Sequence, residues 1–310
     1  MNILVTGANG QLGRMMRRLA LNHDQHHYFY TDIAADETTD ALDITDKAAV
    51  IAYAKSKEID LIVNCAAYVA VDKAEEEEAK AERINCLGVM NLAYTRCRII
   101  HVSTDYVFSG DEHEPCREED KPAPRTAYGR TKLKGENYLL TMLPDSIIIR
   151  TAWLYSEFGN NFVKTMIKLG QEKEDLGVVF DQIGTPTYAE DLAAAIFAAI
   201  ESDEWKPGIY HFTNLGVCSW YDFTVQIHKL YNAQIMLNGF NNKLPQEDVE
   251  KDLIKCHVRP IRSSEYAYKT PRPPYSVLDK TKIVKTFGID IPYWTDSLAR
   301  CIQQLGDIPS

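Results

Sequence analysis

Short β-branched runs alternate with longer amphipathic stretches along the first half of the chain. Apolar runs of about five residues, separated by helical periods, are typical of buried strands in a parallel sheet that is covered on both faces. The pattern predicts strands at 2–6, 27–32, 60–66, 98–104 and 146–153, and helices at 12–21, 46–58, 77–94 and 129–142. This alternation indicates an α/β protein with a Rossmann-type, doubly wound parallel sheet.

The pattern loosens after about residue 155. The apolar run 191–200 predicts a buried helix, whereas Pro- and Gly-bearing stretches such as 258–279 fit a smaller lobe built mainly of loops and short elements. We expect one domain over residues 1–150, together with 178–203, and a lobe made mainly of 151–177 and 204–310.

Composition and charge narrow the class of protein. The 310 residues are 45% hydrophobic and 25% charged, as in an ordinary globular protein. No apolar run approaches the roughly 18–20 residues of a membrane span, and "MNILVTGANG" has neither a basic region nor a cleavable apolar stretch. We therefore expect a cytoplasmic protein without a membrane partner. The net charge of −10 opposes nucleic-acid binding, which needs a basic face.

The seven cysteines are scattered and form no C-x-x-C pair. An odd number of scattered cysteines favours reduced thiols over a disulfide framework. The missing pair also argues against a structural zinc site. The sequence therefore predicts no metal.

A glycine-rich stretch, "TGANGQLG" (6–13), joins the first strand to the first helix. Gly7 permits a tight turn, Gly10 lets the backbone approach a pyrophosphate, and Gly13 lets the helix pack close to the strand. Asp32 lies 19 residues after Gly13, at the end of the second strand, where a carboxylate can bind the adenosine ribose. The pattern predicts a dinucleotide site, with phosphates at a helix N-terminus.

The same stretch leaves the cofactor open between NADH and NADPH. Asp32 favours NADH because a carboxylate repels a 2′-phosphate, while Arg14 could help to accept one. We expect further cofactor contacts from Asn9, Gln11 and Leu12 in the turn, and from Asp43 and Ile44 in "ALDITD". Asp43 or Thr45 could equally cap a helix there.

A Tyr-x-x-x-Lys spacing occurs twice, at Tyr128/Lys132 and at Tyr53/Lys57. Only Tyr128 follows a strand that ends in a hydroxyl residue, Thr104, at the carboxyl edge of the sheet where such folds bind ligands. Reduction of a carbonyl needs a hydride from a nicotinamide and a proton from the protein. We expect Tyr128 to supply that proton, with its pKa lowered by the Lys132 ammonium, and Thr104 to hold the substrate oxygen.

Several motifs carry a resemblance to a known family. "TGANGQLG", "NCAAY" (64–68), "STDYVFSG" (103–110) and "YGRTK" (128–132) resemble the extended short-chain dehydrogenase/reductase superfamily. With "GNNFVKTM" (159–166), "DQIGTPT" (181–187) and "RPPYSVLD" (272–279), the chain more narrowly resembles the dTDP-4-dehydrorhamnose reductase family. The resemblance implies NAD(P)H-dependent reduction of the C4 keto group of dTDP-4-dehydro-L-rhamnose to dTDP-L-rhamnose, which is used in polysaccharide biosynthesis.

The resemblance also implies roles for single residues. Thr104, Tyr128 and Lys132 become the catalytic residues, with Lys132 on the nicotinamide ribose. Further cofactor-side residues are Ala66, Ala67, Tyr68 and the supporting Asn85. The implied substrate contacts are Thr104, Asp105, Tyr106, Tyr128, Trp153, Asn161 and Phe162. The loop 181–187 is expected either to be structural or to contact the substrate.

The chain departs from the family pattern at one place and differs from related dehydratases at another, and two alternative functions stay open. The stretch from Asn85 to Ser103 is several residues shorter than is usual in the family, so we expect a trimmed helix–strand connection. Related dehydratases carry Asp-Glu after the equivalent threonine, whereas Asp105 is followed by Tyr106 here, which argues against dehydration. The sequence leaves open whether the protein forms a homodimer. The alternatives are a reductase of another 4-keto deoxysugar nucleotide, or a non-catalytic nucleotide-binding subunit resembling that of methionine adenosyltransferase.

Overall fold

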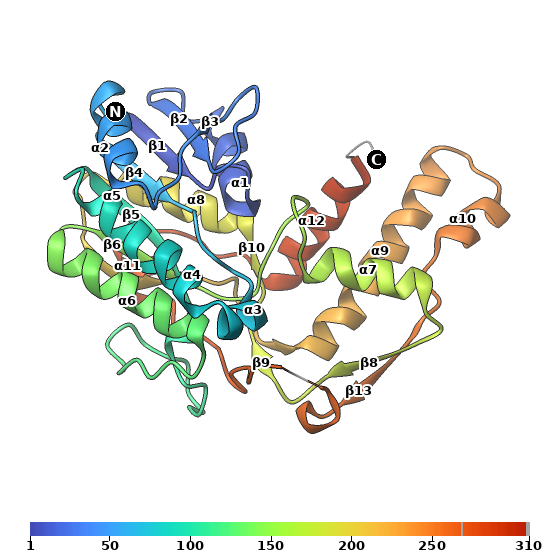
Figure 1. The fold of residues 1–310 in the computed structure, drawn as a ribbon. Coiled ribbons are helices and arrows are strands. Elements are labelled where there is room, and N and C mark those ends of the chain that lie inside the picture. Colours follow the sequence, from blue (N-terminus) through green and yellow to red (C-terminus); the bar gives the residue numbers. More distant parts are fainter. Residues whose placement is uncertain (268, 308–310) are drawn as a thin grey trace.

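A parallel sheet forms the centre of the larger part of the protein (Figure 1). The computed structural model describes residues 1–267 and 269–307, and within them seven strands pair in the order β11-β6-β5-β4-β1-β2-β3. The strands are β1 (Asn2–Thr6), β2 (His27–Asp32), β3 (Asp40–Ala41), β4 (Leu61–Asn64), β5 (Arg98–Thr104), β6 (Ile147–Thr151) and β11 (Gly208–His211). Every neighbouring pair runs parallel, which confirms the predicted doubly wound sheet.

Helices cover both faces of this sheet because successive strand residues point to opposite sides. Ile3 and Val5 of β1 pack into one core with α1 (Gln11–Ala20) and α8 (Ala189–Ile200). Leu4, between them, packs into the other core with α2 (Lys47–Ser56), α5 (Val89–Ala93) and α6 (Ala127–Met142). The predicted strands and three of the predicted helices agree with these elements within two residues at each end.

The predicted helix 77–94 is less regular than its pattern indicates. It is divided into α4 (Glu78–Glu82), a π-helical turn over Arg83–Gly88, and α5, and it is preceded by the unpredicted α3 (Val71–Glu76). A π turn is a rare single-turn change of the hydrogen-bond pattern inside a helix, and apolar spacing read with one helical period over the whole stretch does not identify it. The trimmed connection after α5 consists of residues 94–97, where Arg96 takes a left-handed φ of 64° before β5 begins.

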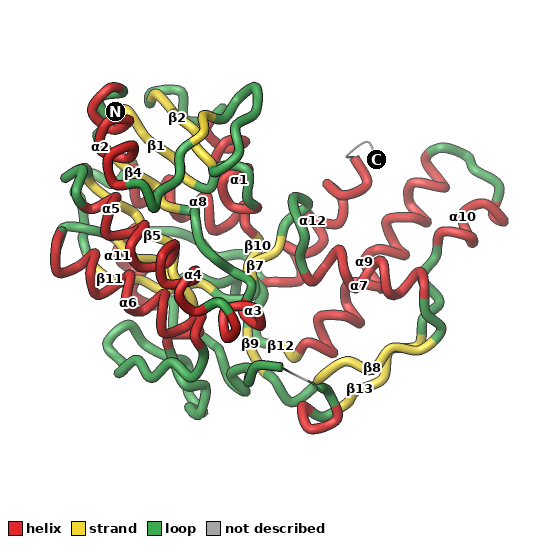
Figure 2. Tube along the Cα trace, in the orientation of Figure 1, coloured by secondary structure: helices red, strands yellow, loops and turns green. Residues whose placement is uncertain are grey.

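A second part of the chain lies to one side of the sheet (Figure 2). It contains α7 (Phe162–Glu172), α9 (Trp220–Asn241), α10 (Gln246–Asp252) and a parallel pair of strands, β8 (Asp175–Val179) and β13 (His257–Ile261). The expectation of mainly loops and short elements was wrong for α9, a 22-residue helix. Its start is a capping box in which Ser219 and Asp222 bond each other's backbone N–H. The predicted helix at 191–200 is confirmed as α8.

Small two-stranded sheets and α12 (Trp294–Asp307) join the two parts. β7 (Leu154–Tyr155) pairs with β10 (Thr187–Tyr188), and β9 (Ile183–Gly184) pairs with β12 (Cys218–Ser219). The expected domain division stays a prediction. However, β11 lies in the range given mainly to the lobe and is a strand of the central sheet, and α11 (Thr281–Phe287) contacts it.

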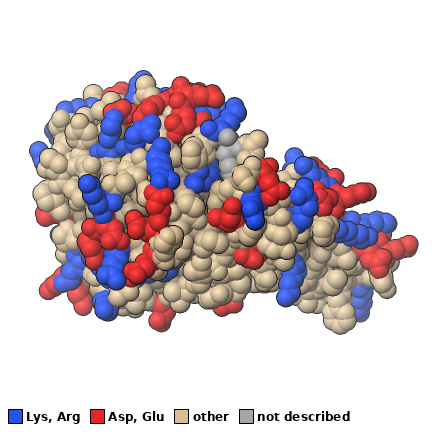
Figure 3. Space-filling view, turned by 90° about the horizontal axis from the view of Figure 1, so that it is seen from below, with Lys and Arg blue, Asp and Glu red and all other residues tan. Residues whose placement is uncertain are grey.

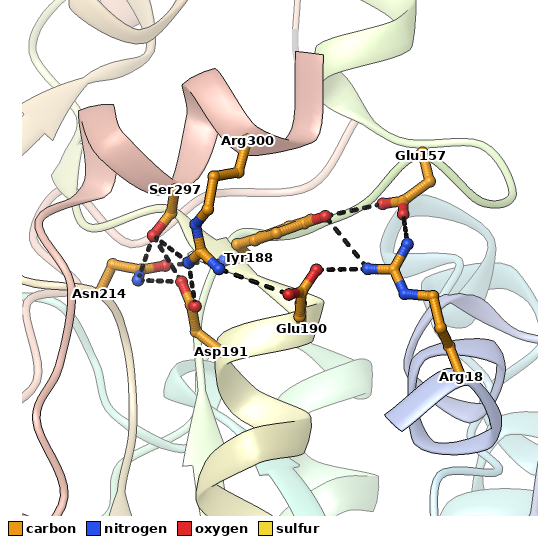
Figure 4. A network of polar contacts seen from close by, with 8 residues as sticks. All are labelled: Arg18, Glu157, Tyr188, Glu190, Asp191, Asn214, Ser297 and Arg300. Carbon is orange, nitrogen blue, oxygen red and sulfur yellow. Dashed lines mark hydrogen bonds and ion pairs between the residues drawn. The ribbon is translucent and has the colours of Figure 1, made fainter. Parts of the chain in front are cut away.

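A network of charged side chains holds α12 (Trp294–Asp307) against the sheet domain (Figure 4). Arg300 of α12 pairs with Asp191 and Glu190 at the start of α8. Arg18 of α1 pairs with the same Glu190 and with the buried Glu157. The carboxylate of Glu190 pairs with both arginines and thus joins α1, α8 and α12. A network of this kind stabilises a fold more than isolated surface ion pairs do.

The exterior is mixed in charge. On the face shown in Figure 3, basic and acidic side chains are interspersed across the molecule. Within the described part of the chain, no helix combines the length and the apolar content needed to cross a bilayer.

One ion pair is fully buried between α6 and the sheet. Arg150 of β6 donates from Nε to Glu136 Oε1 at 3.0 Å and from Nη2 to Glu136 Oε2 at 2.7 Å, and both side chains are at most 2% exposed. A bidentate pair of this kind fixes both groups in one geometry. It therefore fixes the position of α6 relative to β6.

Replacement of Glu136 by Gln tests this anchor. Glu136→Gln leaves the Arg150 guanidinium buried without a counter-charge, so we expect a loss of about 3–5 kcal/mol in the free energy of unfolding, measured by urea denaturation. The matched control is Glu172→Gln, which removes the exposed partner of Lys168 and should leave that free energy nearly unchanged. A loss below about 1 kcal/mol in Glu136→Gln would contradict the anchoring role.

Candidate active site

The glycine-rich turn lies between β1 and β4 at the carboxyl edge of the sheet. Gly7 has a φ of 65°, and a Cβ there would lie 2.6 Å from the Ala66 nitrogen. A Cβ on Gly13 would lie 2.4 Å from the Gly7 oxygen, so both positions require glycine. No side chain caps the start of α1 at Gly10. Its free N–H groups are therefore available to an anion.

Asp32 lies at the end of β2, as the sequence predicts. Its Oδ2 accepts the Asn9 backbone N–H at 3.0 Å and its Oδ1 accepts the Ile33 N–H at 2.7 Å, which fixes the carboxylate. The Asn9 side chain is directed elsewhere: it donates to the Ala34 oxygen and accepts from Thr39. Asn9 thus contributes to the shape of the turn and does not line the cavity beside it.

A cavity of about 850 Å³ begins at this turn and continues along the sheet edge. The predicted residues that line it are Gly7, Gly10, Gln11, Leu12, Gly13, Asp32, Asp43, Ile44, Ala66, Ala67, Thr104, Asp105, Tyr106, Tyr128, Lys132 and Trp153. The glycine turn, the uncapped helix start and the carboxylate at the end of β2 fit a dinucleotide.

Thr104, Tyr128 and Lys132 come together at the far end of this cavity. Thr104 is the last residue of β5, and its hydroxyl hydrogen-bonds the Tyr128 phenol and donates to Asp105 Oδ1 at 2.9 Å. Tyr128 and Lys132 project from one face of α6 because they are one helical turn apart. Thr126 caps this helix by accepting the Gly129 N–H at 3.0 Å.

The pKa of Tyr128 is raised to about 12, mainly because burial disfavours the phenolate. The sequence predicted a shift in the opposite direction, caused by Lys132. The predicted direction was wrong for the protein alone: the Lys132 Nζ donates to the Val102 carbonyl at 2.7 Å, and burial outweighs any effect of its charge on the Tyr128 pKa. The neutral phenol therefore keeps its proton over the whole neutral range.

Burial also shifts the pKa values of two neighbouring residues. Lys132 is 2% exposed, and burial lowers the pKa of its side chain to about 8. Burial likewise raises the pKa of Asp105 to about 7, although Thr104 donates a hydrogen bond to it. Among the described residues, no donor lies in hydrogen-bonding geometry with the buried Asp105 Oδ2, and Asp105 lines both cavities. Such orphaned oxygens mark positions where a ligand group can bond.

A second cavity, of about 780 Å³, adjoins the first and lies between the sheet domain and the lobe. Asp105, Tyr106, Trp153 and Trp220 line both cavities, and Phe162 lines only the second. Trp153 has a left-handed φ of 49° and stacks on Trp220 at 3.5 Å between ring centroids. Backbone strain in a large residue is commonly found at ligand sites.

The loop 181–187 has a structural role beside this tryptophan. A Cβ on Gly184 would lie 2.7 Å from the Trp153 ring, so Gly184 allows the ring to take its place. Gln182 of the same loop lines the second cavity. The structure thus gives Gly184 a structural role, and contact between this loop and the substrate stays a prediction.

Besides Asn9, three predicted residues do not line either cavity. Tyr68 and Asn85 bond each other, with the Tyr68 N–H donating to Asn85 Oδ1 at 2.8 Å, and Asn85 also donates to Thr131 of α6. Asn161 caps α7 and donates to Gln11 Oε1 at 3.0 Å. Each of them supports a segment that carries cavity residues.

Several residues that line the cavities were not predicted from the sequence. Trp220 begins α9 and looks like any core aromatic in the sequence, and Arg272 lies in the "RPPYSVLD" motif without its own signal. Arg272 donates to Asp72 of α3 at 2.7 Å beside the second cavity, and it also bonds the side chain of Tyr106. Only tertiary packing brings residues 72 and 272 together.

The second Tyr-x-x-x-Lys pair has no such surroundings. The Tyr53 hydroxyl donates to Asp40 at 2.7 Å on the outside of α2, and neither Tyr53 nor Lys57 lines a cavity. In the described residues, no group of three or more His, Cys, Asp or Glu side chains is arranged to hold a metal ion.

Comparisons with known proteins agree in one family. The family model "RmlD substrate binding domain" matches residues 1–306. The dTDP-4-dehydrorhamnose reductase of Aggregatibacter actinomycetemcomitans is 39% identical over 304 residues, 96% of each chain. A probable dTDP-4,6-dihydroxy-2-methyloxan-3-one 4-ketoreductase of Streptomyces antibioticus is 40% identical over 284 residues, covering 90% of this chain and 86% of the relative.

A solved structure extends the similarity to the fold. The dTDP-4-dehydrorhamnose reductase of Bacillus anthracis, in complex with NADP, is 34% identical with a TM-score of 0.83, and the match covers 98% of this chain and 99% of that one. The chain therefore belongs to the dTDP-4-dehydrorhamnose reductase family.

Proposed function

We propose that this protein reduces the C4 keto group of dTDP-4-dehydro-L-rhamnose to give dTDP-L-rhamnose, using NADPH or NADH. Family membership supports an NAD(P)-dependent oxidoreductase that acts on a dTDP-sugar. The observation that supports the finer proposal is that the two cavities meet at Asp105 and Tyr106, beside Thr104 and Tyr128 of the cavity that begins at the dinucleotide-type turn.

The bound cofactor supplies the hydride. Tyr128 donates its proton to the C4 oxygen, and the Thr104 hydroxyl holds that oxygen beside the phenol. The raised pKa of Tyr128 keeps the proton on the phenol until the oxygen gains negative charge. The Lys132 ammonium, present below its pKa of about 8, stabilises the phenolate that remains.

Residues from both parts of the chain would hold the substrate. Trp153 and Phe162 offer apolar surface to the sugar nucleotide, and Asp105 offers an unpaired oxygen to a hydroxyl group. We propose on the same grounds that residues 1–150 with 178–203 bind mainly the cofactor, and that the remaining residues bind mainly the substrate.

A second candidate keeps the chemistry and changes the sugar. The 40% identical relative from Streptomyces antibioticus is named for a different dTDP-4-keto sugar, so this family is not restricted to one substrate. Comparison of kcat/KM for dTDP-4-dehydro-L-rhamnose and other 4-keto deoxysugar nucleotides decides between them. A protein that binds NADPH but oxidises it with none of these sugars would instead support the non-catalytic subunit.

Removal of the phenol tests the proton donor. Tyr128→Phe should lower kcat by about 10²- to 10⁴-fold, because the general acid is lost while the ring and the cofactor cavity remain. The assay is oxidation of NADPH with the enzymatically made keto sugar, alongside NADPH binding measured by fluorescence. The matched control is Tyr53→Phe, in the second Tyr-x-x-x-Lys pair, which should keep the wild-type kcat. Retention of more than a tenth of kcat in Tyr128→Phe would exclude the proposed role.

Removal of the Asp32 charge tests the adenosine end of the site. Asp32→Ser should raise the ratio of kcat/KM for NADPH to that for NADH by about tenfold, because a 2′-phosphate no longer meets a carboxylate. Asp36→Asn is the control, since Asp36 bonds Thr38 outside the cavity. An unchanged ratio in Asp32→Ser would mean that the ribose lies away from this carboxylate.

A further inference from the structure

A row of buried polar side chains lies behind Lys132, on the side away from the cavities. It consists of Thr6 of β1, Asn64 of β4 and His101 of β5, each at most 1% exposed. None of the three lines either cavity, and the proposed reaction uses none of them. Buried polar groups persist where their hydrogen bonds are satisfied, so the direction of each bond can be followed along the row.

The orientation of the Asn64 amide is fixed by a backbone donor. Its Oδ1 accepts the Ala66 N–H at 3.2 Å and the Thr6 hydroxyl at 2.7 Å. A backbone N–H only donates, so the oxygen of the amide must be on that side. Asn64 Nδ2 therefore faces His101, at 2.9 Å from Nδ1. Because an amide nitrogen only donates, Nδ1 of His101 must accept.

The tautomer of His101 follows from that bond. Burial and the nearby Lys132 charge hold the pKa of His101 well below its usual range, so the ring is neutral. A neutral imidazole that accepts at Nδ1 carries its proton on Nε2. His101 Nε2 lies 3.3 Å from Lys132 Nζ. An N–H donor is thus held against the lysine nitrogen.

An ammonium group has three donors and no acceptor, whereas an uncharged amine has a lone pair that can accept. The contact between His101 and Lys132 is therefore a hydrogen bond only when the lysine is uncharged. We propose that His101 is a positioning residue, set in its Nε2–H form by Asn64, that presents a donor to Lys132 Nζ and so favours the uncharged amine.

Other groups around Lys132 both raise and lower its pKa. Glu136, on the next turn of α6, favours the charged form, but it is shared with Arg150. The Cys65 thiol faces the lysine from the turn after β4, and Tyr128 lies one turn earlier on α6. Burial is the largest influence and lowers the pKa of Lys132 to about 8. The N–H donor of His101 favours the uncharged amine and therefore lowers the pKa of Lys132. Because lysine is charged only below its pKa, the charge is then lost at a lower pH.

The consequence for catalysis rests on the proposed function, in which the Lys132 charge stabilises the Tyr128 phenolate. That charge is present below about pH 8 and is lost above it. His101 then sets the alkaline limit of the reductase activity without touching the substrate or the cofactor.

The tautomer is tested on the wild-type protein by long-range ¹H–¹⁵N correlation spectra of the histidine side chains. The expected result for His101 is a protonated Nε2 and an unprotonated Nδ1 at neutral pH. His101→Asn assigns the signal by its loss. A protonated Nδ1, in either the other tautomer or an imidazolium, overturns the inference.

The effect on Lys132 is tested by its ¹³Cε chemical shift as a function of pH in lysine-labelled protein, assigned with Lys132→Met. His101→Asn keeps an acceptor near the place of Nδ1 but has no group at Nε2, so the Lys132 midpoint should rise by about one pH unit. His101→Gln carries an amide donor toward the place of Nε2 and should stay closer to wild type. His228→Asn, which changes a buried histidine bonded to the Met166 carbonyl, should not move the midpoint.

These readouts need no turnover, so they separate the inference from the proposed function. An unmoved Lys132 midpoint in His101→Asn, with normal reductase activity, overturns the inference and leaves the function in place. Absence of activity in the wild type overturns the function, while the tautomer and the midpoint still decide the inference. In an active enzyme, the alkaline limb of kcat/KM should move up in His101→Asn by the same amount as the midpoint. If His101→Asn does not fold, the wild-type tautomer, assigned with His101→Gln, decides.

Discussion

The close approach of α6 to its neighbours is the constraint on which the site depends. A Cβ on Gly129 would lie 2.2 Å from the Tyr106 oxygen, and a Cβ on Gly135 would lie 2.1 Å from the Asn85 oxygen. Any side chain at either position would move the helix outward, because backbone atoms cannot yield as a flexible side chain can. The buried pair of Glu136 and Arg150 then holds the seated helix against β6. These contacts bring the side chains of the same helix to the carboxyl edge of the sheet, where ligands bind.

This seating also determines the electrostatics of the site. Tyr128 and Lys132 both lose water when α6 packs down, and burial disfavours the charged form of each, which raises one pKa and lowers the other. The pKa values of the phenol and the lysine, which are similar in water, are therefore moved apart, to about 12 and about 8. The phenol keeps its proton over the neutral range, whereas the lysine loses its charge above about pH 8. The packing of α6 thus sets both the geometry of the two groups and their proton forms.

The sequence predicted the elements whose signal is local. The strands of the central sheet follow from apolar runs, and Tyr128 could be separated from Tyr53 because only one of them follows a strand ending in a hydroxyl residue. It did not predict the direction of the Tyr128 pKa shift, since that depends on how much surrounding structure excludes water. Nor did it predict Trp220 or the Arg272–Asp72 pair, because these contacts join residues that are distant in the chain. The π turn at 83–88 was missed for a different reason: it is a rare local change of the hydrogen-bond pattern that has no residue signature of its own.

The polar row behind Lys132 shows how strand register can carry information that composition hides. Thr6 is paired with Asn64, and Asn64 with His101, in the parallel ladders of β1, β4 and β5. Side chains at paired positions point to the same face, so three polar residues that look unremarkable in separate strands become neighbours. A slip of one residue in either ladder would turn one of them to the opposite face. The row begins one residue before Gly7 of the cofactor-type turn and ends at the lysine of the proposed site. The register that orders the sheet therefore also determines which ring nitrogen of His101 faces that lysine.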